Sequence, residues 1–302
     1  FLTGHHTMFM ACLIAAVLSV GGMKGAPLVI LGSIILGVWM VLSPAILQKY
    51  VREVTGSDDI AVGHFGSIGY FLAGFIGKLT GDKSKSTEEI KVPKSLGFLR
   101  DSSVALSLTM TIMFLVVALV TGQHYIETEL SGGTNYIVFA LLQAITFAAG
   151  VYVVLAGVRM IIAEIIPAFK GIADKVVPNA KPALDCPTVF PFAPNAVIIG
   201  FLSSFVAGVL SMFLLPLFGL AVIVPGLVPH FFCGATAGVI ANAVGGRRGA
   251  IIGSFIHGLL ISFLPALLLP VLGDLGFENT TFGDADFGVI GILLGFLAKL
   301  FS

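Results

Sequence analysis

A small number of polar side chains stand among long apolar runs, and these are the residues that could do chemistry. The stretch ALDCPTVFPFAPNAV, residues 183–197, places Asp185, Asn195 and three prolines between two hydrophobic segments. A carboxylate inside a membrane is costly and is rarely placed there without a polar partner or a cavity. Asp185 could accept hydrogen bonds from the hydroxyl groups of a ligand, or it could cap a helix at an interface. Asn195 could likewise cap the following helix or bind a hydroxyl group.

The histidines form a second group of candidates. His64 lies in the glycine-rich stretch VGHFGSIGYF (62–71), where glycines let the backbone approach a ligand closely. Its imidazole can both donate and accept hydrogen bonds, so we predict a ligand contact, with a polar contact between helices as the alternative. His5 and His6 are adjacent in TGHHTMF (3–9), and neighbours in sequence cannot share one helix face.

Composition indicates an integral membrane protein. The chain is 57% hydrophobic and 11% charged, with a mean hydropathy of +1.05 and a formal net charge of zero. A neutral chain has no basic footprint for nucleic acid, so no nucleic-acid partner is expected. The three cysteines form no CxxC pair and have no metal-like spacing with the histidines, and no HExxH or Walker-type loop is present. We therefore expect no metal and no cofactor.

Several apolar runs are long enough to cross a bilayer as helices. The predicted membrane-length segments are 7–22, 27–47, 103–122, 135–158, 196–219, 221–244 and 249–272. Two shorter, glycine-rich stretches lie at 60–79 and 286–301.

The charges of the connecting segments predict which side of the membrane each one faces. Lysine and arginine gather in 78–101, in 170–181 and at 247–248, whereas 123–134 and 273–287 contain acids and no lysine or arginine. The positive-inside rule places the first group in the cytoplasm and the second group outside.

This alternation leaves 182–195 on the cytoplasmic side without a span of its own. We predict that 184–195 forms a re-entrant hairpin, because non-helical backbone at membrane depth is tolerated only where it is buried in protein or lines a cavity. Glycines at five positions weaken 60–79 as a spanning helix, and this stretch is predicted to be a second re-entrant hairpin.

An internal repeat supports a transporter. The stretch HHTMFMACLIAAVLSVGGMKGA (5–26) resembles PHFFCGATAGVIANAVGGRRGA (229–250), so that His6 aligns with His230. Inverted repeats with broken elements that meet near the midplane are typical of secondary transporters. If the repeat is real, 103–222 needs a counterpart of roughly 120 residues before residue 1, and we expect the chain to be a fragment truncated at its N terminus.

Four motifs carry a family resemblance that runs over essentially the whole chain. They are TGHHTMF (3–9), VGHFGSIGYF (62–71), LDCPTVFPFAPNAV (184–197) and VPGLVPHFFCGATAGVIANAVGG (224–246). Together they resemble the membrane IIC subunit of the ascorbate branch, in the ascorbate/galactitol superfamily, of the bacterial phosphotransferase system. The resemblance implies a homodimeric elevator transporter in the bacterial cell membrane, with a scaffold and a moving core that carries two hairpins. It also implies a partner IIB subunit that carries phosphate on a cysteine, supplied by IIA, and phosphorylates the sugar.

The resemblance also implies the site residues. His5, His64 and Asp185 match the family's substrate ligands, which leaves His6 to packing. The ascorbate members have glutamines where this chain has Phe9 and Phe65, so two amide contacts are absent and the substrate is expected to be ascorbate or a related sugar acid or polyol. The predicted substrate-binding residues are His5, Phe9, His64, Phe65, Asp185 and Asn195.

We therefore predict an all-α integral membrane protein, a multi-helix, multi-pass transporter with inverted repeats and two re-entrant hairpins. The predicted parts are 1–79 (end of the first repeat), 80–102 (cytoplasmic linker), 103–182 (scaffold helices of the second repeat) and 183–302 (core of the second repeat). The predicted function is sugar transport as the IIC component, not catalysis, because phosphoryl transfer belongs to IIB. An ion-coupled secondary permease, with Asp185 and His64 relaying protons, and a membrane scaffold protein without transport remain alternatives.

Overall fold

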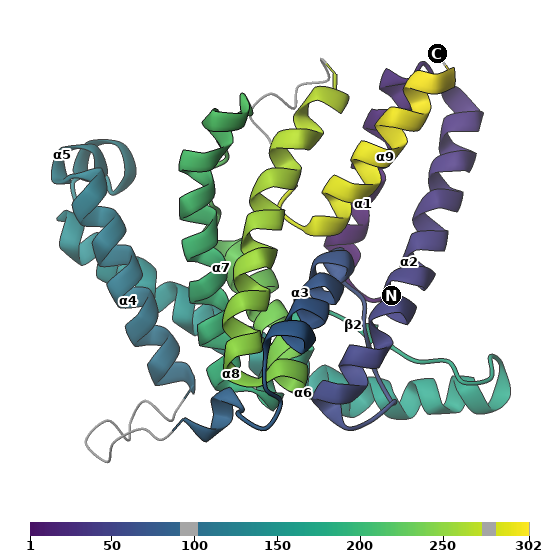
Figure 1. Cartoon of the computed structure of the whole chain (residues 1–302), viewed down its shortest axis with the longest axis horizontal. Coiled ribbons are helices and arrows are strands. Elements are labelled where there is room, and N and C mark those ends of the chain that lie inside the picture. Colours follow the sequence, from purple (N-terminus) through teal and green to yellow (C-terminus); the bar gives the residue numbers. More distant parts are fainter. Residues whose placement is uncertain (91–101, 274–281, 302) are drawn as a thin grey trace. The chain divides into compact units, whose positions relative to one another are not determined.

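Helices account for most of the backbone in the computed structural model, which describes residues 1–90, 102–273 and 282–301. The α-helices are α1 (Gly4–Val20), α2 (Gly25–Thr55), α3 (Ser67–Thr80), α4 (Ser102–Thr121), α5 (Gln123–Tyr125), α6 (Tyr136–Lys175), α7 (Pro194–Leu214), α8 (Leu227–Leu268) and α9 (Ala285–Phe301) (Figure 1). Each predicted membrane-length segment and each short stretch overlaps one of these helices, and the segments 221–244 and 249–272 share α8. The all-α class is therefore confirmed.

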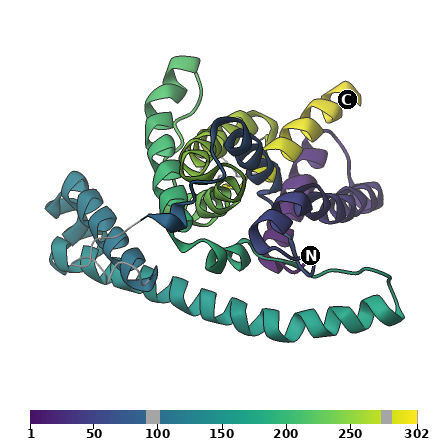
Figure 2. The same ribbon diagram turned by 60° about the horizontal axis from the view of Figure 1, so that its bottom comes forward.

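The chain divides into two compact units. Unit 1 joins Phe1–Glu89 with Ala163–Ser302, and unit 2 is Ile90–Ile162. The division differs from the predicted parts because α6 is 40 residues long and runs unbroken from unit 2 into unit 1 (Figure 2). The predicted scaffold and core boundaries stay predictions.

Four helices in the described part of the chain are long and apolar enough to cross a membrane: α2, α6, α7 with its 3-10 extension to Phe218, and α8 with its extension to Val271. In unit 2, α4 is followed by a bend of 102° and then by α5 and the π-helical turn η3 (Ile126–Leu130), and this pair could form a fifth span. Gly122 makes the bend with a φ of 90°, a conformation that favours glycine.

A sharp break divides α8 at Gly246, which has φ 58° and ψ −155°. The two arms correspond to the two predicted segments, and the basic pair Arg247–Arg248 follows the break. A Cβ atom at Gly246 would lie 2.2 Å from the carbonyl oxygen of Asp82, so only glycine fits this close approach.

The turn between α1 and α2 also contains a glycine with positive φ and a glycine in close packing. Gly22 has a φ of 87°, and its neighbour Gly21 lies against α9, where a Cβ would be 2.5 Å from the Cβ of Ala298. Gly245, which aligns with Gly21, lies in the same way against α3, where a Cβ would be 2.0 Å from the carbonyl oxygen of Gly77. The internal repeat and its inverted sense both stay predictions.

The short helices α3 and α9 begin at a common point inside unit 1 and diverge from it (Figure 1). The backbone N–H of Asp286 donates to the Phe65 carbonyl at 2.9 Å, and the Asp286 carboxylate accepts from the Ile68 N–H at 2.8 Å. The same carboxylate accepts from the Trp39 indole N–H at 3.0 Å. Asp286 is fully buried and thereby joins the two helix starts to α2.

Two short strands, β1 (Ala61–Val62) and β2 (Ala183–Leu184), pair in parallel close to this point, with Ala61 opposite Ala183 and Val62 opposite Leu184. β1 leads to α3, and β2 leads through the 3-10 helix η4 (Cys186–Phe192) to α7. Both predicted hairpin segments are thus a strand followed by helical backbone. Their re-entry into the membrane stays a prediction.

Candidate functional site

Three extended segments meet and deliver polar side chains to one place. The Leu2 N–H donates to the Ala183 carbonyl at 2.9 Å, so the start of the chain lies beside β2. The Gly63 N–H donates to the Leu184 carbonyl at 2.7 Å. His64 directly follows Gly63, and Asp185 directly follows Leu184. The backbone of the strand pair therefore fixes the distance between a histidine and an aspartate that are 121 positions apart.

The side chains of His6, His64, Asp185 and Asp284 form what we call the histidine–aspartate cluster. Asp284 Oδ2 lies 3.0 Å from His6 Nδ1 and 3.6 Å from His64 Nε2, and His64 Nε2 lies 3.8 Å from Asp185 Oδ1. The rings of His6 and His64 are 4.5 Å apart between centroids. Asp284 is the residue that connects the two imidazoles.

A second layer of hydrogen bonds orients the cluster. The Tyr70 hydroxyl lies 2.9 Å from His64 Nδ1, and Cys233 Sγ donates to Asp284 Oδ1 at 2.9 Å. Because two carboxylates face His64 Nε2, a proton is favoured on that nitrogen, and Nδ1 then accepts from the tyrosine. His64 is thereby oriented as a hydrogen-bond donor toward the side of the cluster where Asp185 lies.

The cluster has a buried side and an open side. His64 and Asp284 are 2% and 5% exposed, whereas the Asp185 side chain is 38% exposed. His5 is exposed at the start of α1, and Phe9, one turn further along, is 53% exposed. The His5 ring makes an edge contact with His6, at 4.2 Å between centroids. A ligand that approached the cluster from the open side would meet Asp185 and His5 before the buried residues.

Phe65 and Asn195 lie away from this open side. Phe65 is fully buried and stacks on Phe287, with ring centroids 5.4 Å apart. Asn195 Nδ2 donates to the Thr87 carbonyl at 3.1 Å, and the Asn195 N–H donates to the Glu88 carboxylate, also at 3.1 Å. Glu88 thus caps α7, and the Asn195 side chain holds the 3-10 turn η1 (Thr87–Glu89) instead.

Sequence reasoning missed three members of this arrangement. The sequence predicts packing for His6, places Asp284 in an acidic connection outside the membrane, and does not single out Tyr70. Asp284 and Asp286 are buried, and residues 274–281 of that connection lie outside the described residues. The available signal was an Asp-x-Asp pair directly before an apolar, glycine-rich segment.

Three helix starts surround the cluster. His6 lies in the first turn of α1, Asp284 directly precedes α9, and His64 lies three residues before α3. The N terminus of a helix carries partial positive charge and free N–H groups, which favour carboxylates and anionic ligands. The backbone therefore stabilises negative charge at the same point where the imidazoles lie.

Comparison with known proteins places this arrangement in a family. The family model described as "PTS system sugar-specific permease component" (EIIC-GAT) matches residues 1–286 of the chain. The chain belongs to this permease family. A curated relative, the "Ascorbate-specific PTS system EIIC component" of Mycoplasma pneumoniae, is 29% identical over 271 residues, which is 79% of this chain and 41% of the relative. The chain thus spans less than half the length of that relative. The resemblance to the IIC membrane components is confirmed, and with it a multi-pass protein of the plasma membrane.

The histidine–aspartate cluster of this permease also has the spacing of a cation site. The possible ligand atoms of His6, His64 and Asp284 all lie within 4.8 Å of one another, and so do those of His64, Asp185 and Cys186. Pairing of imidazoles with carboxylates accounts for the same distances. The spacing by itself therefore assigns no metal.

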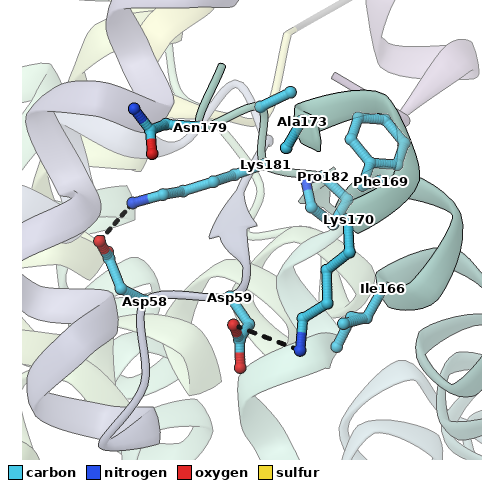
Figure 3. A pocket seen from close by; sticks show the side chains of 10 residues that line it. Asp58, Asp59, Ile166, Phe169, Lys170, Ala173, Asn179, Lys181 and Pro182 are labelled. Carbon is cyan, nitrogen blue, oxygen red and sulfur yellow. Dashed lines mark hydrogen bonds and ion pairs between the residues drawn. The ribbon is translucent and has the colours of Figure 1, made fainter. Parts of the chain in front are cut away.

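Ion pairs fix the two segments that enter the strands. A pocket of about 270 Å³ lies between residues 58–59 and the end of α6, and it is lined by both partners of these pairs (Figure 3). Asp58 accepts from Lys181, and Asp59 lies 4.0 Å from Lys170. The hydrogen bond from Lys181, and then that from Gln48, lower the pKa of the Asp58 carboxyl below its usual value. The pairs hold β1 and β2 side by side, which in turn positions His64 and Asp185.

Proposed function

We propose that the chain forms part of the sugar-translocating membrane component of a phosphoenolpyruvate-dependent phosphotransferase system, with ascorbate or a related sugar acid or polyol as substrate. The histidine–aspartate cluster is the observation that carries this proposal. A polyhydroxylated ligand needs donors and acceptors side by side, and the cluster offers both at the meeting point of three helix starts. Positive helix ends would also favour the negative charge of a sugar acid.

Each predicted site residue has a role in the proposal. Asp185 accepts from substrate hydroxyl groups, His64 donates through Nε2, and His5 contacts the substrate from the open side. A site built this way rejects ligands that lack the hydroxyl groups, because its own polar atoms are then left unpaired. Phe9 offers a ring face to a C–H surface of the sugar.

The other two predicted residues act less directly. Phe65 holds the backbone next to His64, since its carbonyl accepts from the Asp286 N–H at 2.9 Å. For Asn195 to reach a substrate, its contact with Thr87 would have to break first. We assign transport to this permease, as a homodimer, and phosphorylation to its IIB partner, which receives phosphate from IIA.

Replacing the exposed carboxylate tests the proposal. In the full-length protein, Asp185→Asn keeps the size of the side chain and removes its charge. The loss of a charged hydrogen bond costs roughly 1.5–3 kcal/mol, so ascorbate affinity should fall about ten- to hundred-fold. Binding to the purified protein is measured by calorimetry, with other sugar acids and polyols as competitors.

Asp174→Asn is the matched control, because it removes an equal charge from an exposed residue of α6 that belongs neither to the cluster nor to the ion pairs beside the strands. Unchanged affinity in a correctly folded Asp185→Asn protein would remove this residue from the site. An equal loss in both variants would point to a general charge effect instead.

An ion-coupled secondary permease is the second candidate. The His6–Asp284–His64 connection supports it, because buried imidazoles joined by a carboxylate are typical of proton relays. Reconstitution separates the two functions. A phosphotransferase-system component requires phosphoenolpyruvate and the IIB partner for uptake and yields a phosphorylated product. An ion-coupled permease accumulates unmodified substrate, driven by a proton gradient alone.

A further inference from the structure

A groove at the ends of α2 and α3 is separate from the histidine–aspartate cluster. It has a volume of about 600 Å³ and is lined by Lys49, Tyr50, Glu53, Phe75, Lys78, Leu79, Lys83 and Val244. All of these residues belong to unit 1, and none takes part in the contacts of the cluster. The groove therefore needs an explanation of its own.

The groove carries a surplus of positive charge. Lys83 is neutralised by Glu53, whose carboxylate lies 2.6 Å from the lysine Nζ atom. Within the described part of the chain, no carboxylate lies within 4.0 Å of the Nζ atoms of Lys49 or Lys78. Lys49 instead lies over the ring of Phe71, at 4.3 Å from its centroid. Two lysines thus face the groove without an acidic partner.

Next to these lysines lies an exposed apolar surface. Phe75 and Leu79 are 46% and 66% exposed, and they are one helical turn apart on α3. Lys78 lies between them in sequence and on the same side of the helix. Cationic heads beside apolar side chains are the arrangement that suits the boundary between lipid tails and headgroups.

The predicted topology places this groove on the cytoplasmic side, because it lies at the start of the basic segment 78–101. The cytoplasmic leaflet carries anionic lipids, which lysines at the membrane surface attract. We propose that the groove binds one anionic phospholipid, with its phosphate between Lys49 and Lys78 and an acyl chain over Phe75 and Leu79. The charge surplus and the exposed apolar surface match a lipid with a phosphate headgroup.

Lipid binding to the detergent-purified full-length protein tests the proposal. Native mass spectrometry gives the dissociation constants of phosphatidylglycerol and of zwitterionic phosphatidylcholine. The dissociation constant of inorganic phosphate, which has no acyl chain, is measured for comparison. Phosphatidylglycerol should bind more tightly than either. The double variant Lys49→Gln/Lys78→Gln should weaken its binding by about fivefold per lysine.

Two further variants make the result decisive. Lys24→Gln/Lys175→Gln removes the same charge from exposed lysines outside the groove and should leave phosphatidylglycerol binding unchanged. Lys49→Arg/Lys78→Arg keeps both charges and should retain most of the affinity for phosphatidylglycerol. Retained affinity would also show that these two positions tolerate substitution. Equal losses in the two glutamine variants, or phosphatidylcholine binding as tight as that of phosphatidylglycerol, would overturn the proposal.

Discussion

Single residues determine which side chains a ligand can reach, and the two phenylalanines at the predicted site illustrate this. Phe9 is exposed on α1, whereas Phe65 is fully buried against Phe287. The same substitution should therefore have different results at the two positions. Phe9→Gln should change the free energy of unfolding by less than about 0.5 kcal/mol, as is usual at exposed positions. Phe65→Gln should cost about 3 kcal/mol or more, because it removes a buried ring and buries an amide without a partner.

Unfolding by denaturant in detergent measures the difference between the two variants. Ascorbate binding to Phe9→Gln then shows whether an amide at this exposed position improves affinity. Equal destabilisation by both changes would contradict the placement of Phe65 in the interior.

At the scale of elements, the break in α8 depends on one backbone conformation. Gly246 combines a φ of 58° with a Cβ position only 2.2 Å from the Asp82 carbonyl oxygen and 2.4 Å from that of Lys85. Gly246→Ala should therefore lower the free energy of unfolding by about 1–3 kcal/mol, through backbone strain and steric overlap. Thermal unfolding of the purified protein measures the change.

The matched control is Gly171→Ala, at a helical position of α6 where an added Cβ meets nothing within 4 Å. This change should be neutral or stabilise by about 0.5–1 kcal/mol, because alanine restricts the unfolded chain and favours helix. If Gly246→Ala were as harmless as the control, the close packing of the break against residues 82–85 would be wrong.

At the scale of the whole molecule, ion pairs connect segments that are more than 100 positions apart. Lys181 and Arg52 both face Asp58, which joins the entries of β1 and β2. The pKa of Asp58 is lowered in the folded state, chiefly by Lys181. Its contribution to stability is therefore complete above the ordinary value near 3.8 and is lost as the pH falls through the lowered folded value.

The melting temperatures of the wild type and of Asp58→Asn, measured against pH, test this contribution. The gap between the two proteins should be constant from neutral pH down to about pH 5 and should close at lower pH. High salt should also narrow it, since these charges are exposed. A gap that does not change with pH would show that the ion pairs contribute nothing.

Local sequence predicted that helices form and where most of them begin, because a run of about 20 apolar residues has few alternatives in lipid. It did not predict that α6 continues to Lys175 or that two predicted segments join in α8. It also singled out His64 and Asp185, since a polar group in an apolar chain requires a reason. Only the tertiary structure showed that Asp284 joins His6 to His64, that Phe65 faces the interior, and that Asn195 holds the turn at Thr87. These contacts connect residues from 108 (Thr87 and Asn195) to 278 (His6 and Asp284) positions apart. Helix formation depends on neighbours along the chain, whereas such contacts depend on how strands and helix starts pack together, which no local pattern encodes.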